Sequence, residues 1–176
     1  THYLTEFRQR QSDYFYGLNL SANDENQNNH RMIRTYLGLP IDEAGLQATL
    51  DTLENNKNPD FTLIELIRIM AQSEAYDEQI LDEITKLPFW QDEDTERKRV
   101  YTSENHALMW MSTTWLLWEM EGLELGGGPE KVRERLVRYL EVKNQYGFYE
   151  SLSGVYNKFT LVALLNLYDF SDDQEI

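Results

Sequence analysis

The sequence contains no cysteine, which excludes disulfide bonds and cysteine-ligated zinc sites and leaves the redox compartment open. Basic residues are also few: 16 Lys and Arg stand against 31 Asp and Glu, giving a net charge of −15 at pH 7. Such a chain repels a phosphate backbone, so we expect no nucleic-acid partner. No run of about 18 residues is apolar without polar interruption, so we expect no membrane span.

Motifs for metal, phosphate and hydrolase chemistry are missing as well. There is no HExxH pair, and His30 stands alone as a candidate ligand. The glycines 126–128 are not followed by Lys and Ser or Thr, so they do not form a phosphate-binding loop. No Gly-x-Ser-x-Gly elbow occurs, which excludes an α/β-hydrolase. We therefore expect neither a metal nor a cofactor.

Apolar and aromatic residues are plentiful. They make up 41% and 12% of the 176 residues, enough for one folded domain with a sizeable core. Tyrosine and tryptophan dominate the aromatics, with 11 and 4 copies. Both offer an apolar face and a polar tip, which suits a carbohydrate groove and equally suits a helical core.

The spacing of apolar residues is helical almost throughout, and no segment alternates like a strand. Proline, glycine and capping residues punctuate the pattern: Pro59 with Asp60 and Pro129 stand at helix starts, and Gly38 stands at a helix end. The fold class predicted is all-α. The expected helices are 2–20, 31–39, 42–56, 59–72, 77–87, 103–121, 130–145 and 156–169.

Two kinds of helix predict two layers. Helix 130–145 has one apolar face and is expected outside, whereas helices 103–121 and 156–169 are apolar nearly all round and are expected inside. Inner helices walled by outer ones form an (α/α) toroid of antiparallel helix pairs. We expect residues 1–176 to be a single helical domain that forms the N-terminal half of a larger ring.

Polar groups gather where two of the inner helices begin. Asn105 and His106, beside Glu104, open helix 103–121, where the helix dipole favours an anionic group. The loop 147–154 then leads into helix 156–169. This loop and its end carry Tyr149, Glu150, Ser153 and Tyr156. We expect both helix starts to face one opening.

This arrangement resembles the α/α-toroid polysaccharide lyases, the alginate-lyase and heparinase-like group. The matching stretches are SENHALMW and GFYESLSGVYNKFTLVALLNLYDF, and the resemblance covers about residues 100–176. It implies β-elimination on a uronate-containing glycan. Asn105 would neutralise the sugar carboxylate, His106 would be the base or its partner, and Tyr156 would protonate the leaving oxygen.

The chain departs from that pattern at one point. The alginate-lyase group has an arginine shortly before its tyrosine, whereas here Glu150 lies in that region and the nearest cations are Lys143 and Lys158. Two alternatives therefore stay open. One is a glycoside hydrolase using Glu104 and Glu150 as a carboxylate pair. The other is a non-catalytic helical protein, extracellular, that binds glycans or assembles with itself, in which His106 is an ordinary structural histidine.

Two further residues are candidates outside this cluster. Trp90 is a possible sugar-stacking platform or a packing residue of the charged connector 90–101. Asn19 begins an Asn-Leu-Ser triplet that fits N-glycosylation, and we expect a secreted or periplasmic protein. Expected partners are a polysaccharide or oligosaccharide and the remainder of the chain or other subunits.

Overall fold

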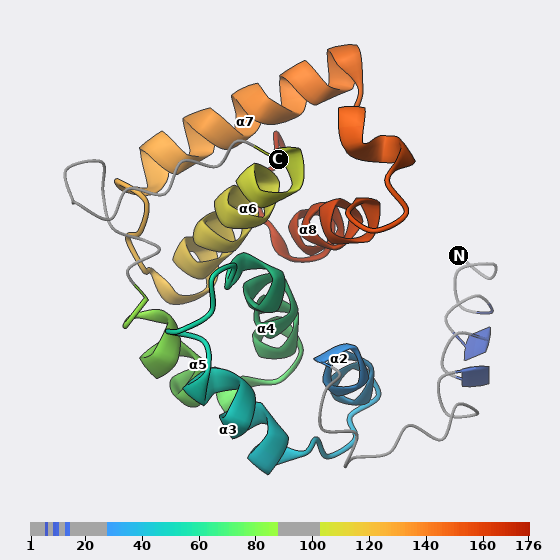
Figure 1. The fold of residues 1–176 in the computed structure, drawn as a ribbon, viewed down its shortest axis with the longest axis vertical. Coiled ribbons are helices and arrows are strands. Elements are labelled where there is room, and N and C mark those ends of the chain that lie inside the picture. The colour runs from blue at the N-terminus through green and yellow to red at the C-terminus, as the bar shows by residue number, and fades with distance from the viewer. Residues whose placement is uncertain (1–5, 7–8, 11–12, 15–27, 88–102) are drawn as a thin grey trace.

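The computed structural model describes residues 6, 9–10, 13–14, 28–87 and 103–176. Within these ranges the chain is helical and contains no strand, which confirms the all-α prediction. Residues 6, 9–10 and 13–14 are helical. The further elements are α2 (Asn28–Tyr36), α3 (Glu43–Asp51), α4 (Asp60–Gln72), η1 (Glu74–Tyr76), α5 (Asp77–Ile84), α6 (Glu104–Glu121), α7 (Pro129–Tyr146), η3 (Tyr149–Leu152) and α8 (Asn157–Phe170) (Figure 1).

The helix boundaries coincide with proline and glycine residues. Pro59 precedes the first residue of α4, and Pro129 is the first residue of α7, where the missing N–H of proline costs nothing. Gly122 ends α6 in the left-handed region at φ 68°, which a side chain would disfavour. Helix α3 is shorter than the predicted 42–56, ending at Asp51.

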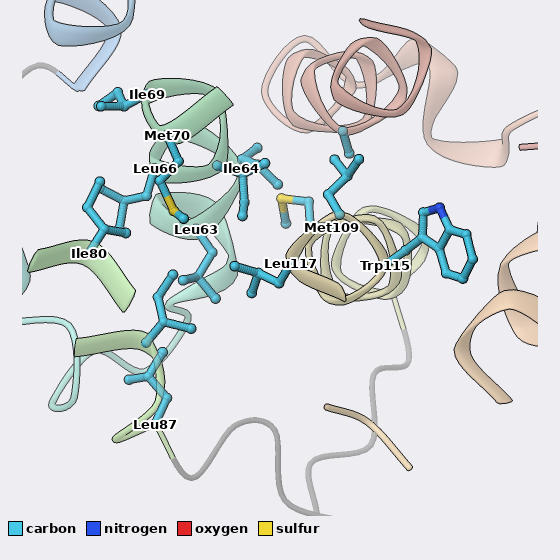
Figure 2. Close-up of a cluster of buried hydrophobic side chains, with 14 of the residues drawn as sticks. Leu63, Ile64, Leu66, Ile69, Met70, Ile80, Leu87, Met109, Trp115 and Leu117 are labelled. Carbon is cyan, nitrogen blue, oxygen red and sulfur yellow. The ribbon is translucent and has the colours of Figure 1, made fainter. Parts of the chain in front are cut away.

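The core lies between α4 and α6. Figure 2 shows Leu63 and Ile64 of α4 near Met109 and Leu117 of α6, and all four are fully buried. Helix α6 lies between α4 and α7 (Figure 1) and buries residues of every face over most of its length. Its expected interior position is confirmed.

Helices α4, α6 and α8 run parallel. At one end, Phe61 near the start of α4 contacts Phe159 near the start of α8, with ring centroids 4.4 Å apart. At the other end, the last turns of the same three helices line one pocket with Ala71, Glu121 and Phe170. The amino-terminal ends of the three helices, and their positive dipole ends, therefore lie on one side of the molecule.

Helix α7 runs the opposite way along α6. Lys143 near its end pairs with Glu104 at the start of α6, while Arg133 near its start pairs with Asp173 after α8. Only Val132 and Leu136 of α7 are fully buried, as its amphipathic pattern predicts for an outer helix.

Helix α8 differs from its prediction. Apolar nearly all round, it was expected to be enclosed, yet Leu161, Leu165 and Tyr168 are exposed. Its opposite face packs on α4 and α6, so only that side is covered by the described residues. Composition alone does not tell on how many sides an apolar helix is covered.

Asn166 joins α8 to α4 through two hydrogen bonds, one of them buried. Its Nδ2 donates to the carbonyl of Ile64 at 2.7 Å, and its Oδ1 accepts from Nε of Arg68 at 2.9 Å. Asn166→Ala leaves both partners without this side chain, so we expect the free energy of unfolding to fall by about 1–3 kcal/mol in urea denaturation. Asn157→Ala, on the exposed first turn of α8, is the matched control. Equal stability of the two variants would contradict this role.

Candidate functional site

Two glutamates from distant parts of the chain accept backbone N–H groups across the contact between η3 and the start of α6. Ser103 occupies the N-cap position but makes no side-chain capping bond. Instead Oε2 of Glu150 accepts the N–H of Asn105 at 3.0 Å, and Oε2 of Glu104 accepts the N–H of Glu150 at 2.9 Å. This is the reciprocal logic of a capping box, made across 45 positions, and it fastens η3 to α6.

Helix α7 completes this anchor. The ammonium of Lys143 pairs with Oε1 of Glu104, whose side chain has no exposed surface. The hydroxyl of Tyr139 donates to the backbone carbonyl of Glu104 at 2.9 Å. Burial, followed by the negative charge of Glu104, raises the pKa of Tyr139 well above its usual value, so this phenol stays protonated. Lys143 also lies 4.9 Å from the ring centroid of Tyr149.

The structure therefore brings Glu104 and Glu150 together, but both carboxylates already have partners within the protein. The carboxylate of Glu104 pairs with Lys143 and accepts hydrogen bonds from the N–H groups of Tyr149 and Glu150. A glycosidase pair needs carboxylates that face a cleft and reach the sugar. The geometry gives Glu104 and Glu150 a clear structural task, which is to hold the loop before α8 on α6.

A second pair joins the starts of α4 and α6. Nδ1 of His106 lies within hydrogen-bonding distance of Oδ2 of Asp60. Asp60 is 1% exposed, whereas the imidazole keeps 21% of its surface exposed. The contact holds the imidazole through Nδ1 and fixes the orientation of the ring at the start of α6. A buried carboxylate that orients a partly exposed imidazole is a common arrangement for a general base.

Aromatic rings connect this pair to the start of α8. Phe61 packs edge-on against His106, with ring centroids 4.9 Å apart, and also contacts Phe159. The backbone N–H of Phe159 bonds to the carbonyl of Tyr156 at 3.0 Å. Tyr156 therefore lies one turn before Phe159, whose ring contacts Phe61 beside His106. The side chain of Tyr156 is 46% exposed.

Two buried polar groups accompany the pair. Asn105 is 1% exposed, and within the described part of the chain its Nδ2 has no hydrogen-bond partner. The same holds for the hydroxyl of Thr160, in the first turn of α8. Unpartnered buried polar groups are costly and therefore unusual in folded proteins. Here both stand at the end of the molecule where three helices begin.

The other predicted residues are placed as follows. Tyr149 is 68% exposed on η3, and Ser153 accepts the backbone N–H of Tyr156 at 3.1 Å, so it shapes the turn that leads into α8. Trp90 and Asn19 lie outside the described residues. His30 belongs to α2.

Sequence reasoning missed Asp60 as a partner of His106. It identified Asp60 only as a helix start, because the 46 positions between the two residues hide their contact. The available signal was the apolar character of both helices: two such helices pack together, and their polar first turns meet if they run parallel. The sequence identified Lys143 as a nearby cation. Its burial against Glu104 could be seen only in the folded structure.

A different carboxylate group lies at the opposite end of the molecule. Glu74, Asp77, Glu121 and Asp169 contribute to an open pocket of about 560 Å³. Burial, then the charges of Glu121 and Glu74, raise the pKa of Asp77. Among the residues that the structure describes, no group of three or more potential ligands is placed to hold a metal ion.

Asp77→Asn is expected to raise the melting temperature at pH 7 by about 1–4 °C. A carboxyl whose pKa is raised on folding stabilises the fold below its unfolded pKa, and this contribution is lost as the pH rises through the folded pKa. The gain should therefore vanish below the ordinary Asp value of 3.8. Asp173→Asn is the opposite control, because Arg133 lowers the pKa of Asp173 and the charged form is favoured. Thermal melts from pH 3 to 7 test this, and a pH-independent gain would contradict it.

Comparison with known proteins returned no match among protein-family models, curated proteins or solved structures. None of the helices in the described ranges has the length and apolar character needed to cross a bilayer. The assignment of a function therefore depends on the chemistry of the site.

Proposed function

We propose that this chain is a polysaccharide lyase-like enzyme with its acid–base centre at the shared amino-terminal end of α4, α6 and α8. The observation that carries the proposal is the pair of Asp60 and His106. The carboxylate is buried and the imidazole is partly exposed, so a buried group of the protein orients a ring that reaches the surface.

The residues fit the steps of β-elimination. His106 takes the proton from the carbon next to the sugar carboxylate, and the electron pair left behind forms a carbon–carbon double bond as the glycosidic carbon–oxygen bond breaks. Tyr156 gives its proton to the leaving oxygen. The resemblance gives Asn105 the task of donating a hydrogen bond to the sugar carboxylate; its Nδ2 is unpartnered but buried, so this step requires the helix starts to open around the substrate. Asp60 stabilises the imidazolium that forms.

Electrostatics limits the substrate. The net charge of −15 repels a densely charged uronate polymer, and Lys143 is occupied by Glu104. The converging helix starts provide local positive potential for a single carboxylate. A glycan with occasional uronate residues fits these charges better than a continuous polyuronate. An extracellular or periplasmic location suits such a substrate.

The (α/α) toroid remains part of the proposal. The parallel course of α4, α6 and α8, with α7 antiparallel along α6, supports it. The direct packing of α4 on α8 is a departure, because inner helices two steps apart in an open ring diverge.

A non-catalytic glycan-binding role is the second candidate. It is favoured by the tyrosines exposed at the end of α7 and on η3: Tyr146 is 75% exposed and Tyr149 is 68% exposed. Exposed phenol rings stack on sugar faces while their hydroxyls bond to sugar hydroxyls.

A substrate panel separates the candidates. The intact protein is incubated with neutral, sparsely uronated and densely uronated glycans while the ultraviolet absorbance of the unsaturated sugar is followed. We expect absorbance to rise on a sparsely uronated glycan. Glycan binding without any product, measured by calorimetry on the same panel, would favour the glycan-binding role over the enzyme. Release of reducing ends without the absorbance change would instead indicate hydrolysis.

A further inference from the structure

Residues 149–156 lead into α8 and lie almost wholly at the surface. Tyr149, Leu152 and Val155 are 68%, 97% and 61% exposed, and no residue of this segment is fully buried. Phe148, just before the segment, packs against the core. A segment that buries no large apolar side chain gains little from the hydrophobic effect, so polar contacts must hold it in place.

The polar contacts to the rest of the molecule are concentrated at one end of the segment. Oε2 of Glu150 accepts the N–H of Asn105 at 3.0 Å. The N–H groups of Tyr149 and Glu150 donate to the carboxylate of Glu104. Lys143 lies 4.9 Å from the ring centroid of Tyr149. The segment is therefore fastened to α6 and α7 through Tyr149 and Glu150.

The other end of the segment bonds to itself. The N–H of Ser153 donates to the carbonyl of Glu150 at 2.8 Å, and the N–H of Tyr156 donates to Oγ of Ser153 at 3.1 Å. A Cβ added to Gly154 would meet no described atom within 4 Å, so this part of the segment is not closely packed. Residues 150–156 are therefore a compact unit whose movement is opposed mainly by the contacts at its first residues.

Asn105 lies where this segment meets α6. It is 1% exposed, although within the described part of the chain its Nδ2 has no hydrogen-bond partner. A buried amide with an unused donor is costly to the fold, and a ligand that supplied an acceptor would recover that cost. The segment therefore covers a group that has the chemistry to bind a ligand but is closed to it.

We propose that residues 149–156 are a lid over the start of α6, which Glu150 latches and which opens to uncover Asn105 while the helices stay folded. In the closed lid the carboxylate of Glu150 occupies the N–H of Asn105. Opening breaks that bond and frees both the N–H and Nδ2 of Asn105 for a ligand with acceptor oxygens. Surface segments with few buried contacts are the parts of a protein that open at the lowest cost.

The lid supplies the opening that the proposed function requires at Asn105, and to that extent it rests on the proposed function. Its test contains no glycan, so the two can fail separately. A lid that opens in a protein without turnover would leave the lid in place and remove the enzyme. Turnover by a protein whose lid never opens would remove the lid alone.

The absence of cysteine allows opening to be measured at single positions. Asn105→Cys places a thiol under the lid, and Ser112→Cys places one two turns further along α6, at a position that is also 1% exposed. A thiol reagent should modify Asn105→Cys about 10²-fold or more faster, and low urea concentrations should accelerate only the reaction of Ser112→Cys. Equal rates with the same dependence on urea would overturn the lid, because global unfolding would then be the only route to position 105.

A second substitution tests the latch. Glu150→Ala, added to Asn105→Cys, should speed the modification about tenfold to hundredfold, because the hydrogen bond that closes the lid is gone. Glu141→Ala removes a carboxylate from the exposed face of α7 and is the matched control. It should change the rate by about twofold or less. A rate that Glu150→Ala leaves unchanged would exclude Glu150 as the latch.

Amide hydrogen exchange of the unmodified protein gives a readout that needs no new side chain. The N–H of Asn105 belongs to the first turn of α6, where no carbonyl of the helix accepts it, so its protection reports the bond to Glu150. We expect low urea concentrations to leave exchange at Asn105 unchanged and to accelerate exchange at the buried Leu117 steeply. Exchange at Asn105 that follows Leu117 across the urea series would contradict a lid that opens on its own.

Discussion

Lys143→Met is expected to lower the free energy of unfolding by about 3–5 kcal/mol, the largest stability effect that we predict for a single substitution. The substitution keeps the apolar stem but removes the charge that faces Glu104, whose carboxylate has no exposed surface. A buried charge without its partner is strongly unfavourable. The loss should appear in both urea and thermal denaturation.

The reason for the size of this effect is that three elements meet at Glu104. Its carboxylate accepts the N–H groups of Tyr149 and Glu150, and its carbonyl accepts the hydroxyl of Tyr139. When Lys143 is lost, η3 is expected to loosen together with the start of α6. Faster amide hydrogen exchange at Tyr149 and Glu150 would report this loosening.

The matched control is Lys158→Met, which removes an exposed lysine of the same charge. We expect it to change the free energy of unfolding by about 0.5 kcal/mol or less. Adding Glu104→Gln to Lys143→Met should recover part of the loss, because a neutral amide needs no counter-charge. If Lys143→Met and Lys158→Met were equally stable, the buried ion pair would not hold this end of the molecule.

His106→Gln is expected to reduce turnover of a uronate glycan by about 10²- to 10⁴-fold, the usual contribution of a positioned general base. Glutamine keeps a polar group beside Asp60 but cannot accept and release a proton. The effect should fall on kcat more than on KM, because the proton transfer belongs to the transition state. Initial rates of the absorbance change, measured with the full chain, test this.

A control for folding accompanies this variant. Because His106 is partly exposed, we expect His106→Gln to keep the helical content of the unmodified protein. Gln145→Ala, on the exposed face of α7, should leave turnover unchanged. Full turnover by a folded His106→Gln protein would exclude the imidazole as the base.

Local rules predicted much of the fold. Pro59 and Pro129 mark helix starts in the sequence, and the structure places helix starts at or beside them because proline restricts the backbone at a single position. The amphipathic pattern of α7 predicted its outer position. These properties depend on residues a few positions apart, and a sequence displays them directly.

The contacts within the site could not be predicted in the same way. The start of α6 is capped by Glu150 rather than by Ser103, and His106 meets Asp60 rather than a residue of its own helix. Both contacts depend on which helices pack in parallel, and that depends on the sum of many apolar contacts. The exposed face of α8 has the same cause, since burial depends on which helices pack beside it.

The pairing of Asp60 with His106 is the central claim, and Asp60→Asn tests it most directly. Asparagine keeps the size of the side chain but removes the charge that orients and stabilises the imidazole. The turnover of Asp60→Asn, His106→Gln and the double variant should be measured on one uronate glycan. We predict that each single variant loses most of the activity and that the double variant is no slower than the slower single one. Full activity of Asp60→Asn, or losses that multiply in the double variant, would contradict the claim that these two side chains act as one unit.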